Sequence, residues 1–199
     1  MKGNGIKSSV NQGPTFRDAL NKAKCDFAAN RSDPKAQFVL GFFRLAHWAR
    51  TGGREKRAIS VPIVMAYRLV VEMLLGIELR PKTQVGAGLR LFHGQGLVIN
   101  DRAVLGGNVT LRHGVTIGSL VDGGPCPVIE DDVEFGASSL VLGPVRIGKG
   151  AKIGAGAIVV RDVPAGGVAR GPAAEVFQPK PFTASPGVSI EHETPSDAG

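Results

Sequence analysis

The stretch that decides the fold is INDRAVLGGNVTLRHGVTI, residues 99–117. A large aliphatic residue occupies every sixth position of it, and a small or β-branched residue follows four positions after each of the first three. Neither the 3.6-residue period of a helix nor the two-residue period of a strand gives this spacing. A six-residue repeat is typical of a parallel β-helix, in which each repeat is one short strand and one turn. In one phase of six, the anchors are Ile99, Leu105, Leu111, Ile117, Ile129, Phe135, Val141, Ile147, Ile153 and Val159.

The composition agrees with a narrow prism of tightly turning coils. Of the 28 glycines, 19 lie in residues 85–171, where Phe92 and Phe135 are the only aromatic residues. Glycine supplies the corners between short strands, and Val, Ile and Ala fit a bore that is too narrow for most aromatic rings. Residues 118–128 carry no anchor. We therefore expect them to form a loop extruded from one coil, where function often lies.

A small α-helical region is predicted before the repeats, with helices at 15–29, 34–50 and 60–76. Pro34 suits the first turn of the second helix. The third helix is strongly apolar, but about 15 residues reach only some 22 Å, short of the ~30 Å hydrocarbon core of a bilayer. Arg68 and Glu72 also interrupt it. We therefore expect a buried packing helix rather than a membrane span.

Positive charge is concentrated in the helical region. Residues 1–76 contain 13 Lys and Arg against five Asp and Glu, whereas residues 77–199 contain 11 against 12. This distribution argues against a uniformly basic nucleic-acid binder, and no zinc-finger or RNP-type motif occurs. Cys25 and Cys126 form neither a disulfide framework nor a metal-spaced pair. The N-terminus lacks the apolar core of a signal peptide, so a cytoplasmic protein is expected.

The repeats and their flanks resemble the hexapeptide-repeat acyltransferases. LFHGQGLVIN (91–100), LGGNVTLRHGVTIG (105–118) and IGKGAKIGAGAIVVRDVPAGG (147–167) look like the serine acetyltransferase branch. The second and third helices, RHGVTIG and the CPVI element resemble the WcaB-type colanic acid acetyltransferases of exopolysaccharide gene clusters. The resemblance implies a mainly β fold with a left-handed parallel β-helix, acetyl-CoA as co-substrate without a metal, and a homotrimer with sites between subunits. The expected organisation is a disordered segment (1–14), a helical region (15–76), the β-helix acyltransferase domain (77–172) and a closing segment with a tail (173–199).

The resemblance also implies a catalytic histidine at His93. In the family, this histidine takes the proton of the acceptor hydroxyl, which then attacks the thioester of acetyl-CoA directly. The chemistry fits, because an alcohol is a weak nucleophile at neutral pH and an imidazole that ordinarily titrates near pH 6.5 can accept its proton. Serine acetyltransferases place an Asp 15 residues earlier to orient the imidazole, and Glu78 holds that position here. Its carboxylate would fix the tautomer and stabilise the imidazolium.

The acceptor is inferred from departures from the serine enzymes. Those enzymes hold the serine zwitterion with an Asp just before the catalytic His and with an Arg-His pair before the Pro of the extruded loop. Here these positions are Phe92, Pro125 and Cys126. A site without charged partners would leave the charges of a zwitterion unpaired, so a sugar hydroxyl over Phe92 is the favoured acceptor. His113 is a candidate to line the acceptor pocket, as is Cys126, whose surroundings in the sequence do not mark an activated nucleophile.

Acetyl-CoA binds in the family along a groove between subunits, largely through backbone groups of the last coils. The matching positions have small side chains that let the pantetheine arm approach: Ser119, Ala137, Gly154 and Ala155. Basic side chains of the late coils are candidates for the nucleotide phosphates: Lys149, Lys152, Arg161 and Arg170.

Three other functions stay open at this stage. The chain could acetylate serine, or it could be a purely structural β-helix. A metal-dependent hydratase on the same fold needs three histidines, and the coils offer only His93 and His113. Independently of the reaction, the basic helical region could make peripheral contact with an anionic membrane, such as the inner membrane face. Its cluster comprises Arg50, Arg54, Lys56 and Arg57.

Overall fold

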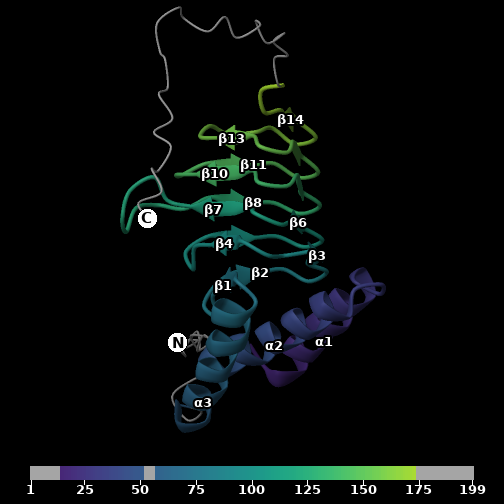
Figure 1. Ribbon diagram of the computed structural model, residues 1–199, viewed down its shortest axis with the longest axis vertical. Coiled ribbons are helices and arrows are strands. Elements are labelled where there is room, and N and C mark those ends of the chain that lie inside the picture. The colour runs from purple at the N-terminus through teal and green to yellow at the C-terminus, as the bar shows by residue number, and fades with distance from the viewer. Residues whose placement is uncertain (1–13, 52–56, 174–199) are drawn as a thin grey trace, which may run out of the picture.

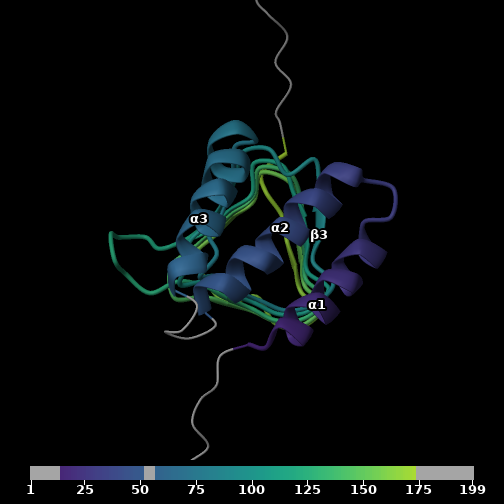
Figure 2. The ribbon, with the colours of Figure 1, turned by 90° about the horizontal axis from the view of Figure 1, so that it is seen from below.

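A computed structural model of the chain describes residues 14–51 and 57–173. A triangular prism of short parallel strands stands on a base of helices, and the successive coils stack along the long axis of the molecule (Figure 1). Seen from below, the three faces of the prism lie behind the helices, and one loop projects from a corner (Figure 2).

Three parallel sheets form the faces. Sheet A has the order β1-β4-β7-β10-β13, sheet B the order β11-β8-β5-β2, and sheet C the order β14-β12-β9-β6-β3. Sheet A comprises Ile77–Leu79 (β1), Leu97–Ile99 (β4), Thr116–Gly118 (β7), Leu140–Leu142 (β10) and Ile158–Val159 (β13). Sheet B comprises Gln84–Val85 (β2), Val104–Leu105 (β5), Val128–Ile129 (β8) and Arg146–Ile147 (β11). Sheet C comprises Arg90–Phe92 (β3), Thr110–Arg112 (β6), Glu134–Phe135 (β9), Lys152–Ile153 (β12) and Val168–Ala169 (β14).

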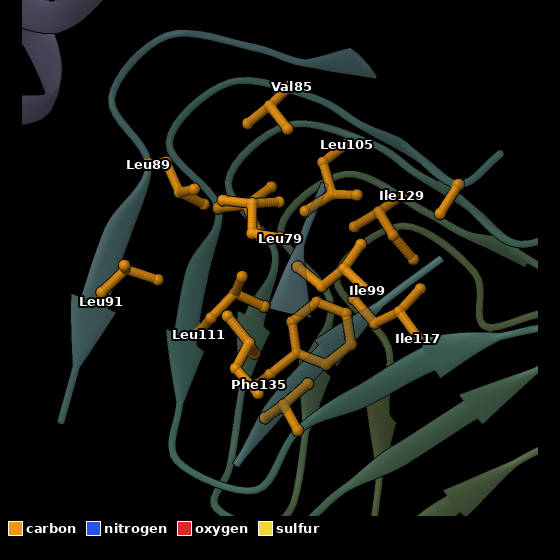
Figure 3. Packing of buried hydrophobic residues seen from close by; sticks show 14 of the residues in the cluster. Leu79, Val85, Leu89, Leu91, Ile99, Leu105, Leu111, Ile117, Ile129 and Phe135 are labelled. Atoms are coloured by element: carbon orange, nitrogen blue, oxygen red, sulfur yellow. The ribbon is translucent and has the colours of Figure 1, made fainter. Parts of the chain in front are cut away.

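The six-residue period is realised as one inward side chain on each face of each coil. All ten predicted anchors are buried, and they meet in the bore of the prism (Figure 3). The parallel β-helix is therefore confirmed. The expectation that the bore excludes aromatic rings is too strict, because Phe135 is only 1% exposed and packs in the middle of the prism. The extruded loop is confirmed as well, since β7 ends at Gly118 and β8 begins at Val128.

The first two helices follow the predicted ranges. Helix α1 spans Phe16–Ala29, and Thr15 forms a capping box with Asp18 at its N-terminus. Helix α2 spans Pro34–Thr51, and the Asp33 carboxylate accepts the Ala36 N–H at 2.9 Å as its N-terminal cap.

The third helix differs from the prediction in its start and its burial. Helix α3 spans Arg57–Tyr67 and continues as a π-helix, η2, over Arg68–Leu74. Pro62 therefore lies inside the helix rather than in its first turn. In that interior position it removes one N–H donor from the helical hydrogen bonds. The helix was expected to be buried, but only one side packs against the rest of the molecule, through Tyr67 and Val71. The other side is largely exposed: Ile59, Val61, Met65, Leu69, Met73 and Leu74.

The structure describes the predicted helices of the chain but not all of its predicted terminal segments. Within residues 14–51 and 57–173, no helix is long and apolar enough to cross a membrane. The predicted disordered start and most of the predicted tail lie outside the described residues, as do Arg54 and Lys56 of the basic cluster.

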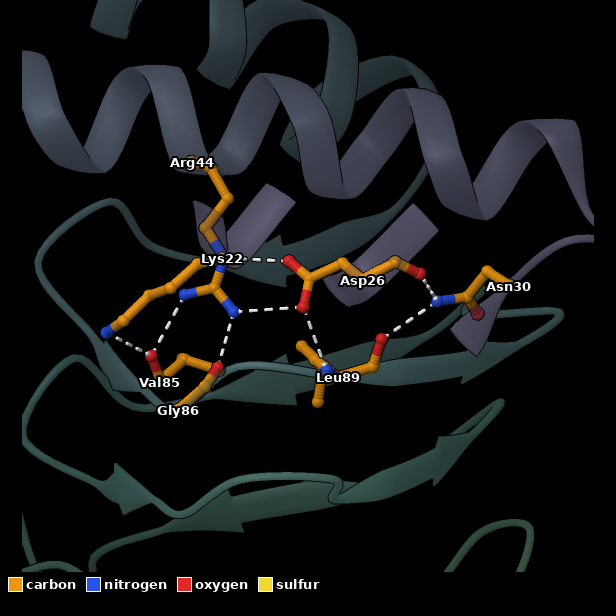
Figure 4. Close-up of polar contacts among 7 residues, drawn as sticks. All are labelled: Lys22, Asp26, Asn30, Arg44, Val85, Gly86 and Leu89. Carbon is orange, nitrogen blue, oxygen red and sulfur yellow. Dashed lines mark hydrogen bonds and ion pairs between the residues drawn. The ribbon is translucent and has the colours of Figure 1, made fainter. Parts of the chain in front are cut away.

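A buried polar cluster attaches the helices to the first coil (Figure 4). Arg44 of α2 donates from Nε to the Asp26 carboxylate of α1 at 2.7 Å, and both side chains are almost fully buried. Arg44 also donates to the carbonyl of Val85 at 2.9 Å, while Asp26 accepts the Leu89 N–H at 2.9 Å. Burial raises the pKa of Asp26, and Arg44 opposes that rise. The cluster is completed by Asn30, which donates to the Leu89 carbonyl at 2.8 Å.

Candidate active site

His93 occupies the corner between strand β3 of sheet C and strand β4 of sheet A. Its φ is 65°, in the left-handed region, and the following Gly94 has φ 53°. Histidine tolerates this region better than most residues do, but at a cost. The corner is fixed by backbone bonds, among them Gly96 N–H to the Gly76 carbonyl at 2.9 Å. The imidazole is exposed at this corner.

The corner that carries His93 is two residues longer than the equivalent corner of the next coil. In sheet C, Arg90 pairs with Thr110, an offset of 20 residues, whereas in sheet A Val98 pairs with Thr116, an offset of 18. The same extra length is visible in the sequence. The buried anchors Leu91 and Ile99 are eight residues apart, not six. A break in a strict repeat thus marks the position of the candidate base.

His113 lies directly beside His93 on the neighbouring coil. The β3–β6 register pairs Phe92 with Arg112, which brings the two histidines to equivalent corners. Their ring centroids are 6.1 Å apart. The registers of β6, β9 and β12 place Ala137 and then Ala155 next along the same edge. Four residues of the predicted site therefore form one column along this edge: His93, His113, Ala137 and Ala155. The first two were predicted for the acceptor side and the last two for acetyl-CoA, and Gly154 adjoins the column.

The Phe92 ring is flanked by two guanidinium groups. Arg112 Cζ lies 4.8 Å from the ring centroid and Arg90 Cζ lies 5.6 Å from it, within the range of cation–π contacts. Positive charge therefore surrounds the position at which the serine enzymes carry an aspartate.

The helical region contributes a carboxylate to the surroundings of His93, which the sequence reasoning missed. A small pocket is lined by His93, Gly94 and Leu91 from the prism and by Asp33 and Lys35 from the start of α2. Nothing in the sequence placed Asp33 beside a residue 60 positions later.

Glu78 lies at the start of the coil that ends at His93, on the open face of sheet A. It is exposed in β1 beside Val98 of β4. It lines a depression of about 230 Å³ that extends to Thr116 and Ser119 and does not include His93. No hydrogen bond joins Glu78 to His93 among the residues that the structure describes, so their proposed pairing stays a prediction.

The extruded loop carries Ser119 and Cys126. Cys126 is partly buried against the hydrophobic core, with Sγ 3.8 Å from the Gly124 carbonyl. Burial raises the pKa of its thiol, which disfavours the thiolate that a nucleophile requires. Arg102 of the preceding coil donates to the Gly123 carbonyl and supports the loop.

The basic residues predicted for the nucleotide are spread over the late coils. Lys152 lies on sheet C with its Nζ 3.5 Å from the Glu134 carboxylate, and Lys149 lies 3.6 Å from Asp132. Arg161 follows β13 at the edge between sheets A and B, whereas Arg170 follows β14 of sheet C. The structure therefore does not gather them around one point of a single chain.

Comparisons with known proteins agree with this geometry. Residues 126–161 match the family described as bacterial transferase hexapeptide (six repeats). The chain is 34% identical over 144 residues to the putative colanic acid biosynthesis acetyltransferase WcaB of Escherichia coli K12, covering 70% of this chain and 88% of that protein. It is 36% identical over 159 residues to a serine acetyltransferase of Mycobacterium tuberculosis, covering 78% of this chain and 66% of that one.

Solved structures give the same picture. The soybean serine acetyltransferase apoenzyme superposes with a TM-score of 0.65 at 29% identity, covering 80% of this chain and 69% of that one. The chain spans about half to two thirds of the length of the curated serine acetyltransferases that it matches.

Proposed function

The chain belongs to the hexapeptide-repeat acyltransferases of the serine acetyltransferase and WcaB type, and from that membership we propose that it is an acetyl-CoA-dependent O-acetyltransferase. Its acceptor is a sugar hydroxyl of an exopolysaccharide or of a precursor. The relatives' names support the acetyl donor, and the residues around His93 support the acceptor.

His93 acts as the general base. Its imidazole accepts the proton of the acceptor hydroxyl as the oxygen attacks the thioester carbon. The new C–O bond forms a tetrahedral intermediate, the C–S bond then breaks, and the imidazolium returns the proton to the leaving thiolate. The exposed corner position and the unusual backbone conformation of His93 support this role, because conformations of this kind cluster at functional sites.

The surroundings of Phe92 are the observation that carries the choice of acceptor. A serine acceptor needs an anionic group for its ammonium as well as a cation for its carboxylate. The two guanidinium groups that flank the aromatic ring next to His93 correct the expectation of an uncharged site, but they could serve only the carboxylate. Phe92 and His113 offer an aromatic surface and a hydrogen-bonding ring, which suit a sugar. Pro125 and Cys126 add no charge from the loop.

Serine acetylation is the second candidate, and one observation favours it. Asp33 lies beside a narrow crevice that His93 also lines, and its carboxylate, which accepts the Ala36 N–H, is an acidic group that could turn toward an ammonium held at the His93 corner. Two matched relatives also bear the name serine acetyltransferase.

An acceptor panel separates the two candidates. Purified chain is incubated with acetyl-CoA and either serine or a set of sugars and nucleotide sugars, and thiol release is followed. The proposal predicts release with a sugar acceptor and none above background with serine. Asp33→Asn is the matched variant. If serine is the acceptor, it would abolish serine-dependent thiol release; if a sugar is the acceptor, it would leave sugar-dependent release within a fewfold. Release with serine alone would replace the proposal by the second candidate.

A homotrimer is part of the proposal. The donor groove would lie between the edge that carries His113, Ala137 and Ala155 and the extruded loop of a neighbouring subunit, which carries Ser119. Three late-coil basic residues would reach the nucleotide phosphates from either side of that groove: Lys152, Arg161 and Arg170.

Glu78 is proposed as a positioning residue for the imidazole. In one chain Glu78 and His93 line separate depressions, so a neighbouring subunit would have to bring the carboxylate to the base. Glu78→Gln is expected to lower kcat at least tenfold, since the corresponding change in a catalytic triad is severe. The acid limb of the profile of kcat/KM against pH should also move to lower pH, because the imidazolium loses its counter-charge. A loss of kcat with an unmoved acid limb would point to a merely structural role.

A further inference from the structure

A second pocket lies where the helical region meets the first coils, away from the His93 corner. Its volume is about 240 Å³. Four cationic and two acidic side chains line it together with two apolar residues: Arg50, Val64, Arg68, Glu72, Arg80, Pro81, Lys82 and Asp101. The family resemblance assigned no role to this pocket.

The pocket carries unpaired positive charge. Arg68 Nε donates to the Glu72 carboxylate at 3.1 Å, which pairs one cation with one acid. The other three cations form no ion pair within the described part of the chain, and Asp101 is the one remaining acid that lines the pocket. Guanidinium and ammonium groups that converge without partners fit a phosphate, whose oxygens accept several charge-assisted hydrogen bonds.

Glu72 adds a hydrogen-bond acceptor to the same pocket. Its side chain is only 10% exposed. While one carboxylate oxygen accepts from Arg68, the other is buried without a partner among the described residues. Leaving a buried carboxylate oxygen without a donor is costly, and a turn of the side chain toward the pocket would let a ligand hydroxyl supply that donor.

We propose that this pocket binds a sugar phosphate, with the phosphate on Arg50, Arg80 and Lys82 and a sugar hydroxyl on Glu72. The inference rests on the proposed function and names its acceptor more narrowly: a sugar that carries a phosphate or pyrophosphate. The pocket adjoins the depression on sheet A that contains Glu78, because Arg80 and Asp101 line both. An acceptor held by its phosphate would therefore extend along sheet A toward the residue proposed to position the base.

The phosphate could come from a soluble nucleotide sugar or from a lipid-linked sugar. Exposed apolar side chains of α3 and η2 adjoin the pocket, since Met65, Leu69 and Met73 line a neighbouring depression together with Arg68 and Glu72. A lipid chain would find apolar surface there, and the experiment must therefore include both sources.

The test measures binding rather than turnover. Inorganic phosphate, inorganic pyrophosphate and glucose 1-phosphate are titrated into the full chain by calorimetry. The double variant Arg50→Gln/Lys82→Gln should bind pyrophosphate at least tenfold more weakly, since it loses two charge-assisted contacts. The matched double variant Arg17→Gln/Arg31→Gln removes two exposed charges outside the pocket and should change affinity less than twofold. Glu72→Gln should remove most of the preference for glucose 1-phosphate over inorganic phosphate.

Vesicles identify the source of the phosphate. Retention on phosphatidylcholine vesicles that carry a polyprenyl phosphate, lost in Arg50→Gln/Lys82→Gln, would support the lipid-linked form. Binding of the soluble probes alone would support the soluble form. The proposal would be overturned if the two double variants bound pyrophosphate with equal affinity, or if no phosphate probe bound. It would also be overturned if both double variants were retained equally on phosphatidylglycerol vesicles.

Failure of this inference can be told apart from failure of the proposed function. His93→Ala should bind pyrophosphate as the unaltered chain does. Pocket-dependent binding without any sugar acetylation would leave the pocket standing and remove the proposed function. Sugar acetylation with an unchanged KM for the sugar in Arg50→Gln/Lys82→Gln would support the proposed function and remove the pocket's role in binding the acceptor.

Discussion

The prism and the helical region are stabilised in different ways. In the prism, every coil repeats the same inward contacts, so the hydrophobic core is distributed evenly along its length. The helical region has no repeat, and one buried cluster around Asp26 and Arg44 joins two helices to the first coil. Burial of apolar surface stabilises both regions, since Val39, Leu40 and Phe43 of α2 belong to the same hydrophobic cluster as the prism. Among the described residues, only the helical region adds a buried ion pair, between Arg44 and Asp26.

The candidate site lies where these two regions meet. His93 comes from a corner that interrupts the repeat, as the extruded loop does at another corner, while Asp33 and Lys35 come from the start of α2. A regular scaffold holds the base in place, and the irregular region supplies the groups that can distinguish acceptors. The phosphate pocket proposed above lies at the same junction, since it combines α2, α3 and η2 with the first two coils.

The largest stability effect is expected from breaking the buried ion pair. Arg44→Ala leaves the Asp26 carboxylate buried without its cation, which should cost about 3–5 kcal/mol. Urea unfolding measures the loss, and hydrogen exchange should show α1 and α2 opening before the prism. Arg146→Ala removes an exposed pair with Glu130 and serves as the control, with an expected cost below about 1 kcal/mol. Equal losses in the two variants would contradict the contrast between the regions.

The sequence predicts the prism in more detail than the helical region, because the prism repeats one set of contacts and the helical region does not. The prism is encoded locally, so anchors such as Leu111 and Phe135 are visible in the spacing alone. Asp26 and Arg44 are 18 residues apart and bond to residues some 40 to 60 positions later, which no local pattern reveals. His93 was identified through a resemblance, although the eight-residue step from Leu91 to Ile99 marks it independently. Asp33 was missed because its approach to His93 depends on how the helices dock.

A smaller effect is expected where the coils touch backbone to backbone. A Cβ at Gly136 would lie 2.3 Å from the backbone N of Ala155 on the next coil, so Gly136→Ala should cost about 1–3 kcal/mol. Gly150 has φ +68° with nothing within 4 Å of a Cβ. Because Asn108 already adopts φ 55° on the same edge of the prism, Gly150→Asn should cost less than about 1 kcal/mol. Thermal unfolding of both variants measures the difference. A larger loss in Gly150→Asn would show that corner conformation, rather than coil spacing, limits the prism.

The smallest effect is a pH dependence at the junction. Burial lowers the pKa of His47, whose Nδ1 lies 2.8 Å from the Pro81 carbonyl. The unfolded chain therefore binds more protons than the folded chain just below the ordinary value of about 6.5, and this contribution to stability is lost as the pH falls through that window. Urea unfolding at about pH 7 and about pH 5.5 should show a smaller change in His47→Gln than in the unaltered chain. An identical pH dependence in both would refute the assignment.

The most direct test of the central claim compares the two histidines that share one edge of the prism. Acetyl-CoA-dependent acetylation of the active acceptor is measured in His93→Ala and His113→Ala, with light scattering to confirm that assembly is unchanged. The account predicts that His93→Ala loses about 10²–10⁴-fold in kcat, the usual contribution of a general base. His113→Ala should lose about tenfold or less, because a typical hydrogen bond to the acceptor contributes only about 0.5–1.5 kcal/mol. Retained turnover in His93→Ala, or a greater loss in His113→Ala, would contradict the assignment of His93 as the base.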